Sequence, residues 1–254
     1  MMRWSERQRA MLQAMGHRVL ADPDAEMAEV EAPVFAPTPA TISIRAESTV
    51  APSDLDALGL DALRERVAAC TLCALCKSRT RTVFGVGHPQ AHWMIVGEAP
   101  GQEEDEQGEP FVGASGRLLD PMLAALGLAR SGTDPAKSVF IANTLKCRPP
   151  RNRNPDPGET AQCLPYLERQ VALVAPRIIL AMGKFAAHAL LGLADDTPVG
   201  RLRGQVHRWR GVPLVVTYHP SYLLRSPAEK ARAWDDLCLA ASVIDVNVPN
   251  ERPR

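Results

Sequence analysis

From residue 91 onward, short apolar runs alternate with longer amphipathic stretches, and this alternation strongly constrains how the 254-residue chain can fold. Apolar runs of six to eight residues predict buried strands, and apolar residues that recur every three or four positions predict helices. We expect strands at 92–97, 138–145, 177–183 and 213–220, and helices at 116–128, 157–175, 184–192 and 228–244. Because strands that alternate with helices form a parallel sheet covered on both faces, the sequence predicts an α/β protein: a three-layer α/β/α fold with a central, mainly parallel four-stranded sheet.

The chain before this region has a different composition. Residues 1–54 are expected to form an N-terminal extension, with one helix at 4–20 followed by a flexible linker rich in acids, Ala, Pro and Thr. The folded domain is predicted at 55–248, beginning with a helix at 55–70, and a tail follows at 249–254.

Charge and hydropathy narrow the function classes. No apolar run approaches the about 20 residues that cross a bilayer, and the N-terminus lacks the apolar centre of a secretory signal, so we expect a cytoplasmic protein without a membrane partner. The net charge is zero, but basic residues gather at 146–153, 201–210 and 225–232, and acidic residues at 22–31 and 98–109. A neutral chain can still present a basic face to an acidic partner, although charge alone favours solvated loops.

The six cysteines indicate a metal site, because close cysteine pairs in a reducing compartment are typical of metal ligation or redox chemistry. Four of them form a C-x2-C pair and a second pair with fifteen residues between its members. These four are Cys70, Cys73, Cys147 and Cys163. Such a set fits zinc or a [4Fe–4S] cluster, and the spacing does not separate the two. Cys76 is a rival ligand, Cys238 lies in an apolar helical stretch, and six free core thiols remain the alternative.

Three unusual segments follow predicted strands, and the carboxyl ends of parallel strands meet at one cleft. The GEAPG turn at 97–101 can aim backbone N–H groups at a ligand, and the Asn143 amide can pair with the edge of a base. His219, in HPS, can stabilise an oxygen that gains charge, and Phe111 can stack on a flat ligand. Each feature taken alone also fits an ordinary turn, cap or core residue.

The order of these motifs carries more information than any one of them. The chain contains C-x2-C-x-L-x3-R (70–79), V-x-G-x-G (83–87), GEAPG (97–101), PFVGASG (110–116), N-x2-KCRPPRNR (143–153), Cys163 and HPSYLLR (219–225). This series resembles the type 4 uracil-DNA glycosylases, the iron–sulfur branch of the uracil-DNA glycosylase superfamily. The resemblance covers about residues 63–239 and leaves the N-terminal extension outside.

The resemblance implies roles for individual residues. A [4Fe–4S] cluster is expected on Cys70, Cys73, Cys147 and Cys163, with Cys76 not a ligand. Glu98 matches the acidic residue near the attacking water, and His219 matches the histidine that hydrogen-bonds uracil O2 as the bond breaks. Phe111 matches the ring that stacks on flipped uracil, and Asn143 matches the amide that reads it.

The remaining assignments concern the turn and the DNA. Gly97, Ala99 and Gly101 are expected to contact uracil through the GEAPG turn. The better-known type 1 enzymes have Asp at the position of Ala99 and Tyr at the position of Gly101. That Tyr excludes the methyl group of thymine, so another residue must do so in this chain, and we assign this role to Glu104. Leu223 matches the residue that fills the gap left by the flipped base. The residues expected to contact DNA phosphates are Ser221, Arg225, Lys146, Arg148, Arg151 and Arg153.

These assignments imply a monomeric enzyme that flips uracil out of single- or double-stranded DNA and hydrolyses its N-glycosidic bond, which starts base excision repair. On DNA it would be associated with the nucleoid, and the 4–20 helix offers a place for a repair or replication partner. Two alternatives stay open. One is a non-catalytic DNA-binding or polymerase-associated module, and the other is a glycosylase, stabilised by zinc, for another deaminated base.

Overall fold

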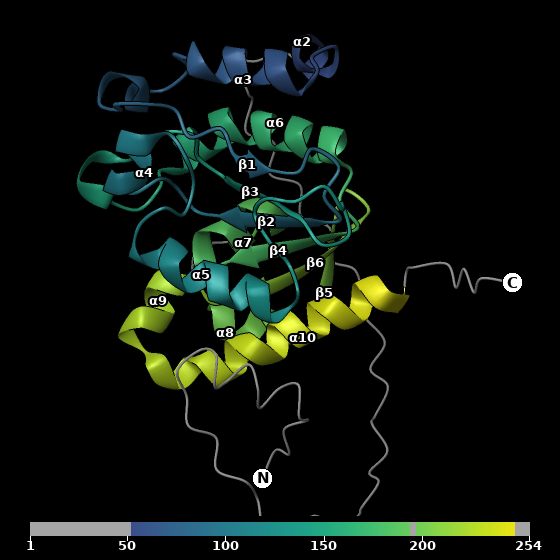
Figure 1. The fold of residues 1–254 in the computed structure, drawn as a ribbon. Helices are drawn as coiled ribbons and strands as arrows, with labels where there is room; N and C mark the ends of the chain where they lie inside the picture. Colours follow the sequence, from purple (N-terminus) through teal and green to yellow (C-terminus); the bar gives the residue numbers. More distant parts are fainter. Residues whose placement is uncertain (1–51, 194–196, 247–254) are drawn as a thin grey trace, which may run out of the picture.

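The structure is a computed structural model that describes residues 52–193 and 197–246. The predicted 4–20 helix, the linker and the 249–254 tail lie outside the described residues, and the boundaries of the 55–248 domain stay a prediction. Helices stack on both faces of one sheet, as Figure 1 shows, so the α/β class and its three layers are confirmed. Within the described ranges, no helix combines the length and apolar character that crossing a bilayer requires.

The sheet has six strands in the order β1-β3-β2-β4-β6-β5. The strands are β1 (Val86–Gly87), β2 (Trp93–Gly97), β3 (Val139–Asn143), β4 (Ile178–Met182), β5 (Val206–Trp209) and β6 (Val212–Thr217). The four predicted strands are β3, β2, β4 and β6, and they run parallel to one another. The predicted number of four is wrong because β1 and β5 add antiparallel edges. β1 has only two residues and β5 is largely polar, so neither forms an apolar run.

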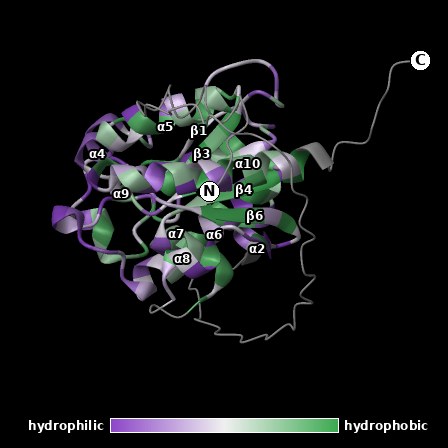
Figure 2. Cartoon of the chain, turned by 90° about the horizontal axis from the view of Figure 1, so that it is seen from below, coloured by the Kyte–Doolittle hydropathy of each residue, from purple (hydrophilic) through white to green (hydrophobic). Residues whose placement is uncertain are grey.

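The two faces of the sheet are covered by different helices. Successive residues of a strand point to opposite faces, so Met94 and Val96 pack in one core while Trp93 and Ile95 pack in the other. The first core includes residues of α6 (Pro157–Val174), α7 (Lys184–Leu191) and α8 (Val199–Leu202). The second core includes residues of α5 (Ala114–Ala125), α9 (Pro220–Arg225) and α10 (Lys230–Val246). Figure 2 shows apolar strands such as β4 and β6 between these layers.

Two further helices, α2 (Pro52–Asp56) and α3 (Leu60–Ala68), pack on the outer side of α6 (Figure 1). The single helix predicted at 55–70 is therefore wrong in detail. The helix is interrupted after Asp56, and a second helix begins after Gly59, which has an extended conformation and is the N-cap of α3. Leu63 and Val67 of α3 are buried in the first core, which places the cysteine-rich segment that follows α3 beside α6.

Short elements lie in the loops between these helices and strands. These are α4 (Gln102–Gln107) and the 3-10 turns η1 (Ala74–Lys77), η2 (Pro150–Asn152) and η3 (Pro227–Glu229). α4 fastens one of these loops, since its buried Asp105 accepts hydrogen bonds from the main-chain N–H of Thr80, at 3.0 Å, and of Arg81. The acidic segment after GEAPG is thus an ordered helix that supports the loops around the site.

Candidate active site

Four of the predicted site residues lie together at the carboxyl edge of the sheet. Gly97 ends β2 and pairs with Asn143, which ends β3. The rings of Phe111 and His219 are stacked, with their centroids 5.4 Å apart and 26° between their planes. A Cβ atom on Gly97 would lie 2.4 Å from Asn143 Oδ1 and 2.7 Å from the Phe111 ring. The absence of a side chain at Gly97 therefore lets the amide and the ring approach one main-chain position.

His219 is held as a neutral donor. It caps α9, and the main-chain N–H of Ser221 donates to its Nδ1 at 3.2 Å, with Ser221 Oγ at 2.8 Å. Because Nδ1 accepts a hydrogen bond from the main-chain N–H of Ser221, we assign the proton of the neutral ring to Nε2. Burial lowers the pKa of His219 to about 4, so the imidazole is uncharged near neutral pH. The ring can thus donate a hydrogen bond from Nε2 without bringing a positive charge.

Gly183, which follows β4, was not anticipated from the sequence as part of this site. Its φ is +89°, which favours glycine, and a Cβ atom there would lie 3.0 Å from the Cβ of His219. The conformation of Gly183 therefore allows His219 to approach the neighbouring strand.

The loop before α5 holds Phe111 in an unusual conformation. Phe111 has a φ of 55°, a left-handed conformation that costs about 1–3 kcal/mol for a residue other than glycine. Arg130 donates to the carbonyl oxygens of Pro110, at 2.8 Å, and Phe111, at 2.6 Å, and is itself paired with Asp120. A Cβ atom on Gly116 would lie 1.7 Å from the Phe111 oxygen. Sequence reasoning missed Arg130 as the residue that fixes this ring.

Glu104 joins the two loops of the site. One oxygen of its carboxylate accepts from the main-chain N–H of Gly101 at 3.0 Å. The other accepts from Val112 at 3.1 Å and Gly113 at 3.0 Å. These bonds tie the GEAPG turn to the loop that carries Phe111. The structure therefore gives Glu104 a positioning role, and its predicted part in excluding a methyl group stays a prediction.

Glu98 follows β2 and is largely buried. Desolvation raises the pKa of its carboxyl group to about 7, so this group changes charge near neutral pH. Its main-chain oxygen accepts hydrogen bonds from Thr144 Oγ1 at 2.5 Å and from the Leu145 N–H at 3.0 Å. Thr144 was not predicted to matter, yet it fastens the turn of Glu98 to the segment that follows β3.

The cysteine-rich segments enclose a small apolar cavity beside α6. All four predicted ligands line it, and so does Cys76. The lining cysteines are Cys70, Cys73, Cys76, Cys147 and Cys163. In the described part of the chain, no three His, Cys, Asp or Glu side chains stand in an arrangement that would hold a metal ion. Cys238 lies apart in α10 and packs against the second core, as its apolar surroundings predict.

Hydrogen-bond donors surround this cavity. Arg79 Nη1 donates to Cys147 Sγ at 3.1 Å, and the main-chain N–H of Lys146 donates to Cys163 Sγ at 3.2 Å. Tyr166 also lines this cavity. Burial raises the pKa of Cys163 to about 12, so this thiol stays protonated unless a metal replaces its proton. Arg79 belongs to the C-x2-C-x-L-x3-R motif, which could have pointed to it.

The structure overturns the predicted phosphate contact of Lys146. Its side chain is only 1% exposed, and Nζ donates to the Asn143 oxygen at 2.7 Å and to Gln170 Oε1 at 2.6 Å. Burial lowers the pKa of Lys146 to about 8. The prediction is wrong because a basic stretch gives no sign of which member turns inward.

The other basic residues reach the surface to different extents. Arg151 and Arg225 are exposed, and Arg148 is half-buried with a hydrogen bond to Asn152. The Arg153 guanidinium is paired with the Glu159 carboxylate at 2.6 Å. Arg151 and Arg225 are therefore the more accessible cations of the predicted DNA-contacting set.

Leu223 is also placed differently from its predicted role. It is fully buried in the second core, at 0% exposure, and cannot fill a gap in a duplex from there. Its neighbours on α9 face outward, with Tyr222 37% and Leu224 45% exposed. A motif match fixes the position in the chain, but the helix decides which side chain points to solvent.

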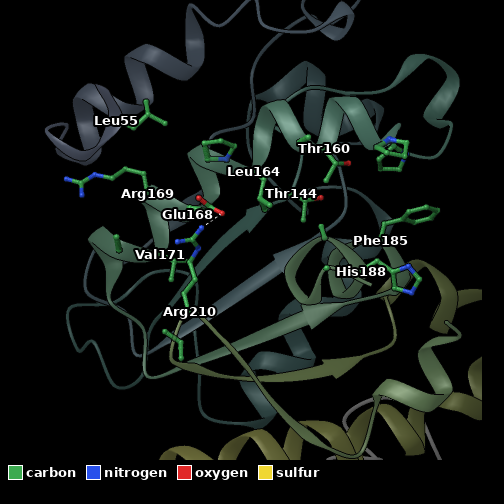
Figure 3. Close-up of a pocket in the computed structure, with 18 of the residues that line it drawn as sticks. Leu55, Thr144, Thr160, Leu164, Glu168, Arg169, Val171, Phe185, His188 and Arg210 are labelled. Atoms are coloured by element: carbon green, nitrogen blue, oxygen red, sulfur yellow. Dashed lines mark ion pairs between the residues drawn. The ribbon is translucent and has the colours of Figure 1, made fainter. Parts of the chain in front are cut away.

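A groove of about 980 Å³ lies between α6, α7 and the turn joining β5 to β6 (Figure 3). The Arg210 guanidinium and the Glu168 carboxylate pair at 2.5 Å at one end, and Thr144, Phe185 and His188 also line the groove. None of the predicted site residues is among the described residues that line it. This groove and the predicted site are therefore separate features.

The fold and the site define an α/β protein with a stacked ring, an amide and a neutral imidazole at the carboxyl edge of a parallel sheet. The sequence model described as the uracil DNA glycosylase superfamily matches residues 84–238, more than half of the chain. The chain belongs to this superfamily.

Curated relatives narrow the similarity within the superfamily. The chain is 43% identical over 174 residues to the type-4 uracil-DNA glycosylase of Archaeoglobus fulgidus, which covers 66% of this chain and 84% of the relative. It is 42% identical over 188 residues to the type-4 uracil-DNA glycosylase of Pyrobaculum aerophilum, which covers 72% of this chain and 93% of the relative. It is 40% identical over 176 residues to the type-4 uracil-DNA glycosylase of Thermotoga maritima, which covers 68% of this chain and 87% of the relative.

Proposed function

We propose that this chain removes uracil from DNA by hydrolysing the bond between the base and its deoxyribose. The observation that carries the proposal is the neutral, half-buried imidazole of His219, stacked beside Phe111 at the strand edge where Asn143 ends β3. The names of the curated relatives support the same reaction.

Base recognition follows from the donors and acceptors of the site. The base must leave the stack before the glycosidic bond can be reached, and a weak U·G pair lowers the cost of flipping. Once flipped, uracil would stack on Phe111, while the Asn143 amide accepts from N3–H and donates to O4. Cytosine presents the opposite pattern at this edge, and each unsatisfied buried group would cost about 1–3 kcal/mol.

Bond cleavage moves negative charge onto uracil and positive charge onto the sugar. The His219 Nε2–H would donate to uracil O2 as it gains charge, and main-chain N–H groups of the 97–101 turn would assist. The ionised carboxylate of Glu98 would orient the attacking water and offset the charge of the sugar. Near neutral pH His219 would make this donation as an uncharged imidazole.

The four predicted ligand thiols that line one cavity support a [4Fe–4S] cluster at this place as part of the proposal. Cys70, Cys73, Cys147 and Cys163 would hold it, and the hydrogen bonds from Arg79 and from the Lys146 main chain would stabilise the sulfur charge. When bound, the cluster would supply a covalent link between the segment after α3, the loop after β3 and α6. Its contribution is therefore structural in this proposal.

The DNA-contacting surface would include the exposed cations and one apolar side chain. Arg151 and Arg225 would contact phosphates, which positions DNA without reading its sequence. We propose Leu224, in place of Leu223, as the residue that fills the space left by the flipped base. Leu224 is exposed on α9, the helix that begins directly after His219.

An excision assay tests the proposal and separates it from the alternatives. The full-length protein is incubated with labelled oligonucleotides that carry uracil, hypoxanthine, thymine or cytosine opposite guanine, and abasic sites are cleaved with alkali. We expect product from uracil and none from thymine or cytosine. Product from hypoxanthine alone would indicate a glycosylase for another base. Binding without product from any substrate would indicate a non-catalytic module.

A further inference from the structure

We propose that Lys146 is a positioning residue that holds Asn143 in place for base recognition and links it to the cysteine cavity. The inference rests on the proposed role of Asn143 in reading uracil. It gives a function to a buried cation that sequence reasoning had assigned to the DNA surface.

A chain of buried hydrogen bonds carries the inference. Lys146 Nζ donates to the Asn143 carbonyl oxygen at 2.7 Å and to Gln170 Oε1 at 2.6 Å. Gln170, on α6, is fully buried, and its Nε2 donates to the Phe84 oxygen at 2.8 Å. The main chain of the residue proposed to read the base is thus fastened through Lys146 to the C-terminal part of α6.

The same segment reaches the cavity within a few residues. The Lys146 N–H donates to Cys163 Sγ at 3.2 Å, and Cys147, the next residue, lines the cavity. In the other direction, the Thr144 N–H donates to the Gly97 oxygen at 2.9 Å. A shift of the 143–147 segment would therefore move the base-reading amide relative to Gly97 at the end of β2.

A buried ammonium is costly unless it is well partnered, and an apolar side chain would fill the same space without that cost. Unlike an apolar side chain, the ammonium of Lys146 donates hydrogen bonds to the Asn143 carbonyl oxygen and to Gln170 Oε1. It fixes the peptide carbonyl of Asn143, and a fixed peptide limits the directions in which the Asn143 side chain can point. Removing Nζ should leave the amide present but less well placed.

A double-mutant cycle tests this coupling. Single-turnover rates of uracil excision are measured for the wild type, Lys146→Met, Asn143→Ala and the double variant. Misplacement of a positioned group by about 1 Å costs about 100-fold in rate, so we expect a loss of that order for Lys146→Met. In the Asn143→Ala background the amide that Lys146 positions is gone, so Lys146→Met should alter the rate by no more than about 2-fold. A factor of about 2 is the usual error of additivity in such cycles.

Two controls separate positioning from folding. Lys137→Met removes an exposed lysine outside the site and should leave the rate unchanged. Lys146→Met/Gln170→Leu removes both partners of one buried bond, which preserves stability better than removing one. It replaces Lys146→Met in the cycle if the single variant does not fold. Thermal unfolding and the absorbance near about 400 nm are compared for every variant to check fold and cluster.

The outcomes are distinct. An equal rate loss from Lys146→Met in both backgrounds would overturn the inference and leave the role of Asn143 intact, because the lysine would then act on stability or on the cavity alone. An unchanged rate for Lys146→Met would overturn it as well. An unchanged rate for Asn143→Ala would overturn both the inference and the proposed reading of uracil by this residue.

Discussion

Replacing Gly97 with alanine should disable the site while leaving the fold in place. The new methyl carbon would lie 2.4 Å from Asn143 Oδ1 and 2.7 Å from the Phe111 ring, whereas ordinary contact begins at 3.4 Å. The amide must therefore retreat by about 1 Å, and misplacement of that size costs about 100-fold in rate. This factor corresponds to about 2.7 kcal/mol of transition-state stabilisation.

The assay is single-turnover excision of uracil from an oligonucleotide, with binding measured separately on abasic DNA. Gly59→Ala is the matched control, because nothing lies within 4 Å of a Cβ atom at that position. We expect the control to keep the wild-type rate, and Gly97→Ala to bind abasic DNA as well as the wild type. A Gly97→Ala variant that excises uracil at the wild-type rate would refute the packing argument for this site.

Three further predictions concern charge, packing and the cavity. Because burial raises the pKa of Glu98 to about 7 and the ionised form is required, the excision rate should rise about tenfold per pH unit below pH 7 and level off above it, and Glu98→Gln should abolish this rise. Leu223→Ala should lower the free energy of unfolding by about 2–5 kcal/mol, and Leu224→Ala by no more than about 0.5 kcal/mol, in denaturant titrations; the opposite ranking would contradict the burial assigned to them. Cys147→Ala should lose the absorbance near about 400 nm, and a variant that keeps this absorbance would exclude Cys147 as a ligand.

The pattern of apolar residues in the sequence predicted the strands and helices that are buried in the two cores. The four parallel strands are nearly continuous apolar runs, and α6 and α7 lie within one residue of their predicted bounds, with Gly192 closing α7 in a left-handed conformation. The edge strands escaped prediction because an edge needs little apolar surface and often carries charge, as in the VHRW of β5.

The candidate site was predicted at the level of residue identity and motif order, but not of side-chain direction. Lys146 and Leu223 both sit in matched motifs, yet both point inward, because Gln170 and the second core, which receive them, are contributed by other helices. Arg130 escaped notice for the same reason. It contacts the Phe111 loop only after α5 has folded back along the sheet.

The rate of uracil release by His219→Ala, relative to the wild type, tests the central claim most directly. Removing one donor that stabilises a developing oxyanion costs about 100- to 1000-fold in the chemical step. We predict a loss of that size in single-turnover excision, with binding to uracil-containing DNA changed far less. A His219→Ala variant that excises uracil as fast as the wild type would contradict the account, because the imidazole would then have no part in the reaction.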